Sequence, residues 1–387
     1  MTISRKDFLD KTTHLGLLLT TSQLLQYCSS LPDRYADTSP FDQENLSPLW
    51  KSIYAGIGAP NPHNTQAWKI KILNENEILL FVDESRILLD TDPPARQIHI
   101  GQGSFIECFS IGAAQLGYTT KVQYFPQGEY KTSEIGKKPV AKLTLSAGDS
   151  NKKKFFKSLN IRNTNRSIYS GDFSETDRDK IQNEIQYDKS NFKWILSSDS
   201  RFAKIQDLLV EAFAIETNLK RTNEENRIWF RVTDKEIYSK RDGISLRGNG
   251  MSGLSYKIIS NFFVSTKPED WHSDFTRKAG IDSFKEQVKS SKAFIYILTS
   301  KNEMKDWVES GEKYAHLNIA VNSLSYSMHP MSQFLQEYPE MEKVKLEFEK
   351  LMEIPPKAKI QMFARIGKSD YFFQSPRRNP QDMIVKS

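Results

Sequence analysis

The sequence predicts an α+β protein built from two similar units in one chain. Helical and strand-like patterns alternate over most of its length. The stretch GSFIECFSIGAAQLGY (103–118) aligns with GEKYAHLNIAVNSLSY (311–326) at one constant offset, with four identical positions, and VAKLTLS is echoed later by KAKIQMF. We therefore expect one unit at about 45–150 and a second at 155–387, packed against each other as a pseudo-dimer.

The composition is that of a globular protein. Of the 387 residues, 38% are hydrophobic and 26% are charged, and the net charge of +6 is spread along the chain. A diffuse excess of this size does not indicate a nucleic-acid-binding surface. The two cysteines, Cys28 and Cys108, exclude a disulfide framework, and no cysteine–histidine group has the spacing of a zinc site. We expect neither nucleic acid nor a structural metal as a partner.

Residues 1–44 are expected to form a signal-like segment and a linker. SRKDFL followed by LGLLLTTSQLL is similar to a twin-arginine signal with Lys6 in place of the second arginine. LLQYC is similar to a lipoprotein cleavage site before Cys28, with the bulky Tyr27 in place of a small residue. This pattern favours the periplasm or cell envelope, with membrane association through the N-terminus. An ordinary amphipathic helix and a cytoplasmic location are the alternative.

The first unit begins with an expected helix, LSPLWKSIYAGIGA (46–59), because Ser47 can cap it and Pro48 suits its first turn. A second, longer helix is expected over 97–118, and its many glycines, alanines and serines allow a neighbouring backbone to approach closely. Alternating or compact apolar patterns predict strands. These expected strands are WKIKIL (68–73), ILLFVD (78–83), KVQYF (121–125) and VAKLTLS (140–146).

Each half carries a segment that the other half lacks. The first half has the polar loop NPHNTQAW (61–68) between its opening helix and strand, which is either solvated or packed against something polar and flat. The second half opens with IRNTNRSIY, followed by the expected strand FKWILSS (192–198). The second half also carries an insertion at about 221–280, with the glycine-rich RGNGMSG and several aromatic residues. This insertion is either a lid over a binding site or a surface excursion.

Basic residues form the clearest candidate for anion binding. Arg162 and Arg166 lie four residues apart with Thr164 and Asn165 between them, and guanidinium groups present forked donors to phosphate oxygens. Arg377–Arg378 near the C-terminus could fold back on the same anion. The alternative is that all of these are surface arginines in solvated turns.

Three motifs resemble those of the flavin-dependent nitroreductase superfamily. APNPHNTQAW resembles the superfamily's APSxxNxQPW, RNTNRSIY resembles its R-x-S-x-R phosphate motif, and RIGKSDYFFQSPRRNPQDMI resembles its C-terminal strand and basic segment. Asn61–Pro62 and Ala67 depart from the first motif. The order of elements and the doubling are similar to the Acg-like branch, in which two nitroreductase units are fused. The resemblance extends over nearly the whole chain from Ser47.

The resemblance implies an FMN between the two units, one per chain. It places phosphate and ribityl contacts at Arg162, Thr164, Asn165, Arg166, Arg377 and Arg378. It places ring contacts at Asn61, Pro62, His63, Asn64 and Gln66, and at Pro330, Met331 and Ser332. No catalytic side chain is expected, because flavin N5 carries the hydride. His329 is either an acid beside the ring or a structural histidine.

The function implied is an FMN-binding oxidoreductase of nitroreductase type. It would transfer hydride from NAD(P)H to a small acceptor such as a nitro-aromatic or a quinone, as a monomer that acts as a pseudo-dimer. The first alternative is a non-catalytic FMN-binding or sequestering protein whose lid occludes the flavin. The second is a lipid-anchored interaction protein with a decayed flavin site.

Overall fold

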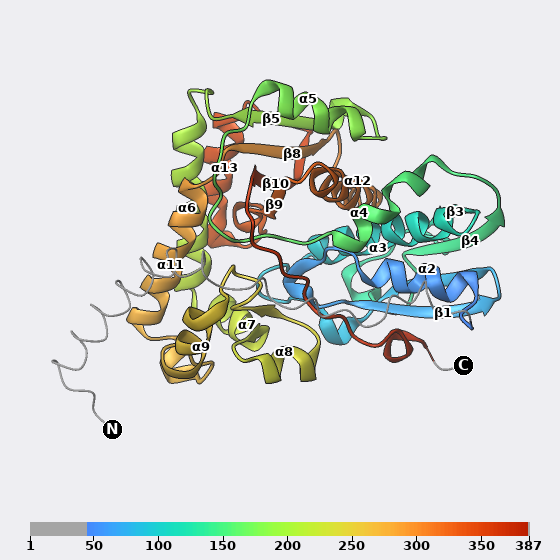
Figure 1. Cartoon of the computed structure of the whole chain (residues 1–387), viewed down its shortest axis with the longest axis horizontal. Coiled ribbons are helices and arrows are strands. Elements are labelled where there is room, and N and C mark those ends of the chain that lie inside the picture. Colours follow the sequence, from blue (N-terminus) through green and yellow to red (C-terminus); the bar gives the residue numbers. More distant parts are fainter. Residues whose placement is uncertain (1–44, 386–387) are drawn as a thin grey trace.

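The computed structural model describes residues 45–385 and confirms the α+β class (Figure 1). The signal-like segment lies outside these residues. The first half consists of α2 (Pro48–Ile57), β1 (Trp68–Asn74), β2 (Glu77–Val82), α3 (Arg96–Gln115), β3 (Tyr118–Tyr124) and β4 (Ala141–Ala147). Its four strands form an antiparallel sheet in the order β1-β2-β4-β3. The expected cap of α2 is confirmed, because the Ser47 hydroxyl accepts a hydrogen bond from the Trp50 amide.

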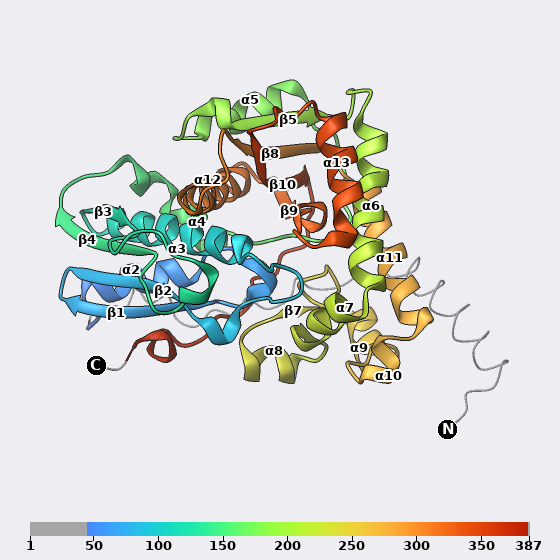
Figure 2. The ribbon, with the colours of Figure 1, turned by 180° about the vertical axis from the view of Figure 1, so that it is seen from behind.

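The second half repeats this topology. It contains α4 (Phe156–Ile161), α5 (Glu175–Glu184), β5 (Phe192–Leu196), α6 (Phe202–Asn218), β8 (Ala293–Thr299), α12 (Met304–Ser323), β9 (Ser327–Pro330), α13 (Glu342–Leu351) and β10 (Lys359–Gly367). Its antiparallel sheet has the order β5-β8-β10-β9, so each strand takes the place of its counterpart in the first sheet. The long helices α3 and α12 lie between the two sheets (Figures 1 and 2).

The insertion lies between β5 and β8 and forms a helical lobe below the second half (Figure 2). After α6 it comprises α7 (Lys220–Ile228), β6 (Phe230–Arg231), α8 (Asp234–Lys240), β7 (Ile244–Ser245), α9 (Gly253–Phe262), α10 (Pro268–Trp271) and α11 (Asp274–Lys289). The lobe has an apolar cluster of its own, made of Val232, Leu246, Tyr256 and Ile259. It is therefore a packed substructure and not an irregular loop.

The two long helices cross at a glycine on each side. A Cβ added to Gly103 would lie 1.7 Å from the carbonyl oxygen of Val308, and a Cβ added to Gly311 would lie 1.9 Å from that of Ile100. Positions 100 and 308, like 103 and 311, are 208 residues apart, so the contact is reciprocal, as at a two-fold interface. We call this contact the α3–α12 seam. The expected close approach is confirmed, and the tandem arrangement is compatible with this geometry.

Both long helices end earlier than their sequence patterns suggest. The pattern over 97–118 predicts a helix to Tyr118, but α3 ends at Gln115 because Gly117 adopts a left-handed conformation with φ of 81°. Ser325, which stands 208 residues later, follows α12 with φ of 62°. The residues that follow each turn then enter a strand.

The chain after β10 returns to the first half. The Val385 amide donates to the carbonyl oxygen of Ile70 at 2.8 Å, so the C-terminal segment lies along the edge strand β1. This path carries the segment of Arg377 and Arg378 across the polar loop. Among residues 45–385, no helix has both the length and the apolar composition needed to cross a membrane.

Candidate functional site

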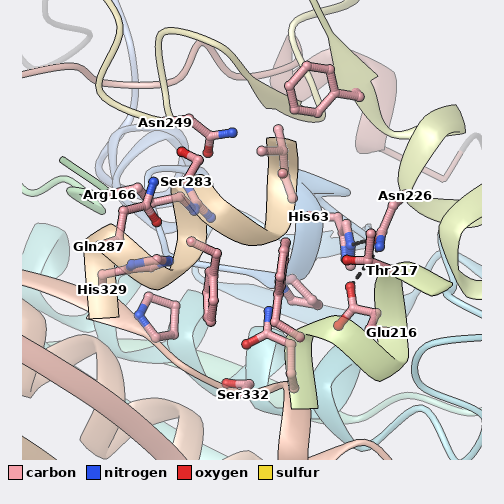
Figure 3. A pocket seen from close by; sticks show the side chains of 18 of the residues that line it. His63, Arg166, Glu216, Thr217, Asn226, Asn249, Ser283, Gln287, His329 and Ser332 are labelled. Carbon is pink, nitrogen blue, oxygen red and sulfur yellow. Dashed lines mark hydrogen bonds between the residues drawn. The ribbon is translucent and has the colours of Figure 1, made fainter. Parts of the chain in front are cut away.

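A cavity of about 370 Å³ lies where the polar loop, the long helices and the insertion meet (Figure 3). Its size falls within the range of small-molecule sites. Seven of the predicted site residues line it, and five of these seven have polar side chains. From the predicted set the lining includes Asn61, Pro62, His63, Thr164, Arg166, Pro330 and Ser332, together with His329. The structure therefore brings the beginning of the polar loop and the second arginine of the motif to one space.

Arg166 places a cation at one end of this cavity. Its guanidinium makes no hydrogen bond and no ion pair with any residue between 45 and 385. Burial lowers the pKa of Arg166, because the surroundings solvate the charge poorly. A buried guanidinium of this kind is expected to attract an anion or a strong acceptor.

His329 lies at the same end of the cavity and is held neutral (Figure 3). Its Nδ1 accepts a hydrogen bond of 3.1 Å from Nε of Arg365, its partner across β9 and β10. Burial, with the nearby charges of Arg365 and Arg166, holds the pKa of His329 well below its usual value. Since Nδ1 accepts, the ring proton is on Nε2, and His329 is a neutral donor. This favours the structural role over that of an acid.

The opposite end of the cavity holds a hydrogen-bonded chain of three side chains (Figure 3). Nε2 of His63 lies 2.7 Å from Oδ1 of Asn226, and Nδ2 of Asn226 donates to Oε1 of Glu216 at 2.7 Å. Oε2 of Glu216 accepts from Nε2 of Gln336 at 2.9 Å. Glu216 is 3% exposed, and burial raises the pKa of its carboxyl.

An apolar wall joins the two polar ends. It comes largely from the insertion and from α6, which precedes the insertion. It consists of Phe213, Phe230, Leu246, Met251, Ile259, Phe263, Trp271, Phe275 and Phe284. Of the aromatic residues that the sequence indicated in the insertion, Phe230 and Phe263 line the cavity. Trp229 instead packs near the guanidinium groups of Arg86 and Arg231, and Phe262 is exposed.

Arg162 and Arg377 meet outside the cavity, at the C-terminal end of α2. Arg162 donates from Nη2 to the carbonyl oxygen of Gly58 at 2.8 Å, and Nη2 of Arg377 donates to the same oxygen at 3.3 Å. Carbonyl groups at a helix C-terminus attract cations. Burial and the charge of Arg162 lower the pKa of Arg377 to about 9. The two basic motifs are thus brought together, and phosphate binding by them stays a prediction.

The later part of the polar loop is bound to the protein's own chain. Nε2 of Gln66 donates to the carbonyl oxygen of Arg241 at 2.7 Å, and Oε1 of Gln66 accepts from the amide of Arg378 at 2.8 Å. Asn64 accepts from Nη1 of Arg377. These side chains do not line the cavity, so the polar character of this part of the loop is explained by contacts within the chain. Their contact with a flavin ring stays a prediction.

Two further predicted residues are engaged in the fold. Asn165 donates from Nδ2 to the carbonyl oxygen of Tyr371 at 2.7 Å and accepts from Ser167. Met331 is fully buried, and its amide donates to the carbonyl oxygen of Phe363 at 2.8 Å. Neither side chain faces the cavity in this structure.

Glu216 and Asn226 were missed in the sequence, although one signal could have indicated Glu216. The apolar face of α6 carries Ile205, Leu209 and Ala212 at helical spacing, and Glu216 follows one turn later on that face. A carboxylate on a buried stripe requires a partner, and so indicates a polar site. Asn226 gives no comparable signal, because the residues beside it in α7 are polar.

The cavity fits a flat aromatic group that carries negative charge, such as FMN. Arg166 has no partner within the described part of the chain, and Oε1 of Gln333 is a buried acceptor without a hydrogen bond there. Both residues line a space with an aromatic wall. A flavin presents ring donors and acceptors together with a phosphate, so the donor set and the wall suit it.

A separate group of buried and partly buried titratable side chains lies beside the α3–α12 seam. Its members are Glu107, Tyr124, Lys152, Tyr187, Glu312 and His316. Glu107 forms ion pairs with Lys152 at 2.5 Å and His316 at 2.9 Å, and its pKa is lowered to about 2 despite burial. Glu312 accepts hydrogen bonds from Tyr124 and Tyr187, and burial raises its pKa to about 7.

We expect replacement of Glu312 with glutamine to reduce the pH dependence of stability. The carboxyl keeps its proton in the folded protein up to about pH 7, whereas the unfolded chain loses it near its ordinary value of 4.5. Stability therefore falls as pH rises from about 4.5 to 7, by an amount on the order of 3 kcal/mol. Asp92, whose pKa burial raises to about 7, adds a fall in the same window.

Urea unfolding of both proteins at about pH 5 and about pH 7.5 isolates the contribution of Glu312. The variant is expected to lose less stability between these values than the wild type. Glu309→Gln, at a more exposed position on α12, is the control and should follow the wild type. Equal losses in wild type and Glu312→Gln would contradict the raised pKa of Glu312.

Comparison with known sequences gives a local match. The protein of Mycobacterium tuberculosis named as an NAD(P)H nitroreductase, Acg, is 35% identical to this chain over 75 residues. The match covers 19% of this chain and 22% of Acg, so the chain is matched over about a fifth of that relative's length. No protein-family model matches the sequence.

Comparison with solved structures gives distant similarities. The FMN-dependent nitroreductase NfnB of Mycobacterium smegmatis, solved in complex with NADPH, has a TM-score of 0.37 and 11% identity, with 60% of this chain and 98% of NfnB covered. An FMN-dependent nitroreductase from Clostridium difficile R20291 has a TM-score of 0.30 and 13% identity, with 58% and 92% covered. Superpositions at this level assign no residue roles.

Proposed function

Because the chain belongs to the nitroreductase superfamily, we propose that it is an FMN-dependent oxidoreductase. Its reaction would be hydride transfer from NAD(P)H to a nitro-aromatic, a quinone or a similar acceptor. The local match to Acg and the three motifs support this assignment. One observation links this function to a site: the guanidinium of Arg166, which has no partner among residues 45–385, lines a cavity with an aromatic wall.

The protein's own groups have distinct tasks in this proposal. Arg166 would bind the negatively charged or electron-rich part of the cofactor, and His329 would donate a hydrogen bond from Nε2 at the same end. The wall of the insertion would exclude water and hold flat molecules in place. When bound, FMN accepts and releases a hydride at N5, which is the chemistry that the side chains do not supply.

An anaerobic absorbance titration of the FMN-reconstituted protein tests the proposal. Addition of NADPH or NADH is expected to bleach the visible flavin bands, because hydride reaches the ring, and an added quinone or nitro-aromatic is expected to restore them. Bound flavin that neither nucleotide bleaches would overturn the oxidoreductase assignment and favour the non-catalytic alternative. Protein that binds no FMN would overturn the cofactor assignment as well.

We further propose one FMN per chain and a monomer that binds it. The complementary halves support this, since Arg166 stands in the second half and the Asn61–His63 segment in the first, and one cavity uses both. Calorimetric titration with sedimentation analysis is expected to give a ratio of one on a monomer. Two flavins per chain would contradict it. Export to the cell envelope remains a proposal from the N-terminal sequence.

A further inference from the structure

The three-residue chain at one end of the cavity fixes the proton positions of His63. An ionised Glu216 only accepts hydrogen bonds, and it receives one at each oxygen, from Asn226 and from Gln336. Asn226 therefore directs its amide nitrogen to Glu216 and its oxygen to His63. Because that oxygen only accepts, Nε2 of His63 must carry a proton.

The other ring nitrogen of His63 is available to a ligand. His63 lines the cavity, and its Nδ1 makes no hydrogen bond with residues 45–385. Whenever the imidazole carries a second proton, that proton is on Nδ1. The chain of hydrogen bonds that begins at Nε2 of His63 ends on the carboxylate of Glu216 on α6.

The backbone at His63 is held in an uncommon conformation. His63 has φ of 48° and Asn64 has φ of 51°, both in the left-handed region. Two successive residues in this region cost free energy, and such strain concentrates at functional sites. Here the strained turn places the ring between the cavity and Asn226 (Figure 3).

We propose that His63 donates a proton to the acceptor that is reduced in this cavity, with Asn226 and Glu216 as its positioning residues. This inference rests on the proposed oxidoreductase function. A quinone becomes a hydroquinone by gaining a hydride and one proton. The hydride comes from NAD(P)H through the cofactor, while the Nδ1–H bond of His63 breaks and an O–H bond forms on the acceptor. The imidazole regains its proton from water.

The geometry also defines the class of acceptor. Its oxygen must reach the His63 end while its body lies against an apolar, aromatic wall that contains Phe230 and Trp271. A flat apolar molecule with a reducible oxygen at its edge, such as a quinone, satisfies both conditions. The cation Arg166 lies at the far end and is left for the cofactor.

Reoxidation of the reduced holoenzyme by two kinds of acceptor tests this inference. In stopped-flow experiments, His63→Gln is expected to slow reoxidation by a benzoquinone by about 10²-fold, the lower range of general acid catalysis. Reoxidation by ferricyanide, which takes electrons without a proton, should be unchanged. Gln can still donate to Asn226, and a neighbour, Gln66, already adopts φ of 51° as glutamine, so the loop is expected to fold.

The two proposals fail in different ways. If NAD(P)H never bleaches the wild-type flavin, the proposed function is wrong, and dithionite-reduced protein still allows the comparison of acceptors. If His63→Gln reoxidises with quinone as fast as the wild type, or slows equally with ferricyanide, His63 is not the proton donor. Glu216→Gln is expected to show a smaller loss of the same kind, limited to the quinone.

A readout on cofactor-free protein tests the positioning separately. With ¹⁵N-labelled histidine, the neutral ring of His63 is expected as the Nε2–H tautomer, and Asn226→Leu should abolish that preference by removing the acceptor. A fixed Nδ1–H tautomer in the wild type would overturn the assignment. His63→Gln identifies the signal by its loss.

Discussion

Replacing Gly311 with alanine is expected to lower the free energy of unfolding by about 3 kcal/mol or more. The added methyl group would lie 1.9 Å from the carbonyl oxygen of Ile100, which belongs to the backbone of α3 and cannot rotate away. The two helices would have to separate along the α3–α12 seam, and contacts along their length would be lost. Gly103→Ala is expected to behave alike, because its methyl group meets Val308.

Gly280→Ala is the matched control for this substitution. Gly280 lies inside α11, and an added Cβ would meet no atom within 4 Å. Alanine at such a position favours the helix by about 1 kcal/mol, so the control should be slightly more stable than the wild type. Urea unfolding gives all three values. A Gly311→Ala protein as stable as the wild type would contradict the close approach at the seam.

Replacing Arg166 with alanine is expected to weaken FMN binding by about 10²-fold and to leave the cofactor-free protein at least as stable. The first effect follows from losing a charge-assisted contact to an anionic ligand, worth up to about 3 kcal/mol. The second follows because the guanidinium has no hydrogen bond or ion pair within residues 45–385, and burial disfavours its charge. A purely structural arginine would give the opposite sign for stability.

Fluorescence titration with FMN and thermal unfolding of the cofactor-free protein measure the two effects. Arg166→Lys keeps the charge without the forked donors and should bind with intermediate affinity. Arg178→Ala, on the surface helix α5 and paired with Asp179, is the control and should bind FMN like the wild type. Unchanged affinity in Arg166→Ala would refute the assignment of the cavity as the cofactor site.

The elements with strong periodic patterns were predictable, and the tandem arrangement expected from the repeated sequence pattern is compatible with the two sheets. Ser47 and Pro48 mark the start of α2, and the strands at 68–74 and 77–82 follow the apolar alternation closely. The early end of α3 was not predictable from hydrophobic pattern, because Leu116 and Tyr118 continue that pattern. The left-handed turn at Gly117 ends the helix, and glycine alone does not reveal that it will turn there.

The site was predictable where a motif carries its chemistry and not where partners come from distant segments. His63, Thr164 and Arg166, whose polar character stands out in short motifs, line the cavity, and their contact with a cofactor stays a prediction. The Gln66 side chain instead forms hydrogen bonds with the backbone of Arg241 and Arg378, which lie 175 and 312 residues away in the sequence. The motif indicates polar atoms, and only the fold decides whether a ligand or the chain itself satisfies them.

In a homodimer, a substitution at a two-fold interface is present in both subunits. The two sides of the interface therefore cannot acquire different residues. Positions 104 and 312 are separated by the same 208 residues as the glycines of the seam, and they have diverged. Ser104 is small and borders the open cavity, whereas Glu312 is buried among tyrosines beside a lysine–glutamate pair. In a single chain each of the two positions is encoded separately. One side of the seam can therefore border a cavity while the other side is packed with contacts that hold the two halves together.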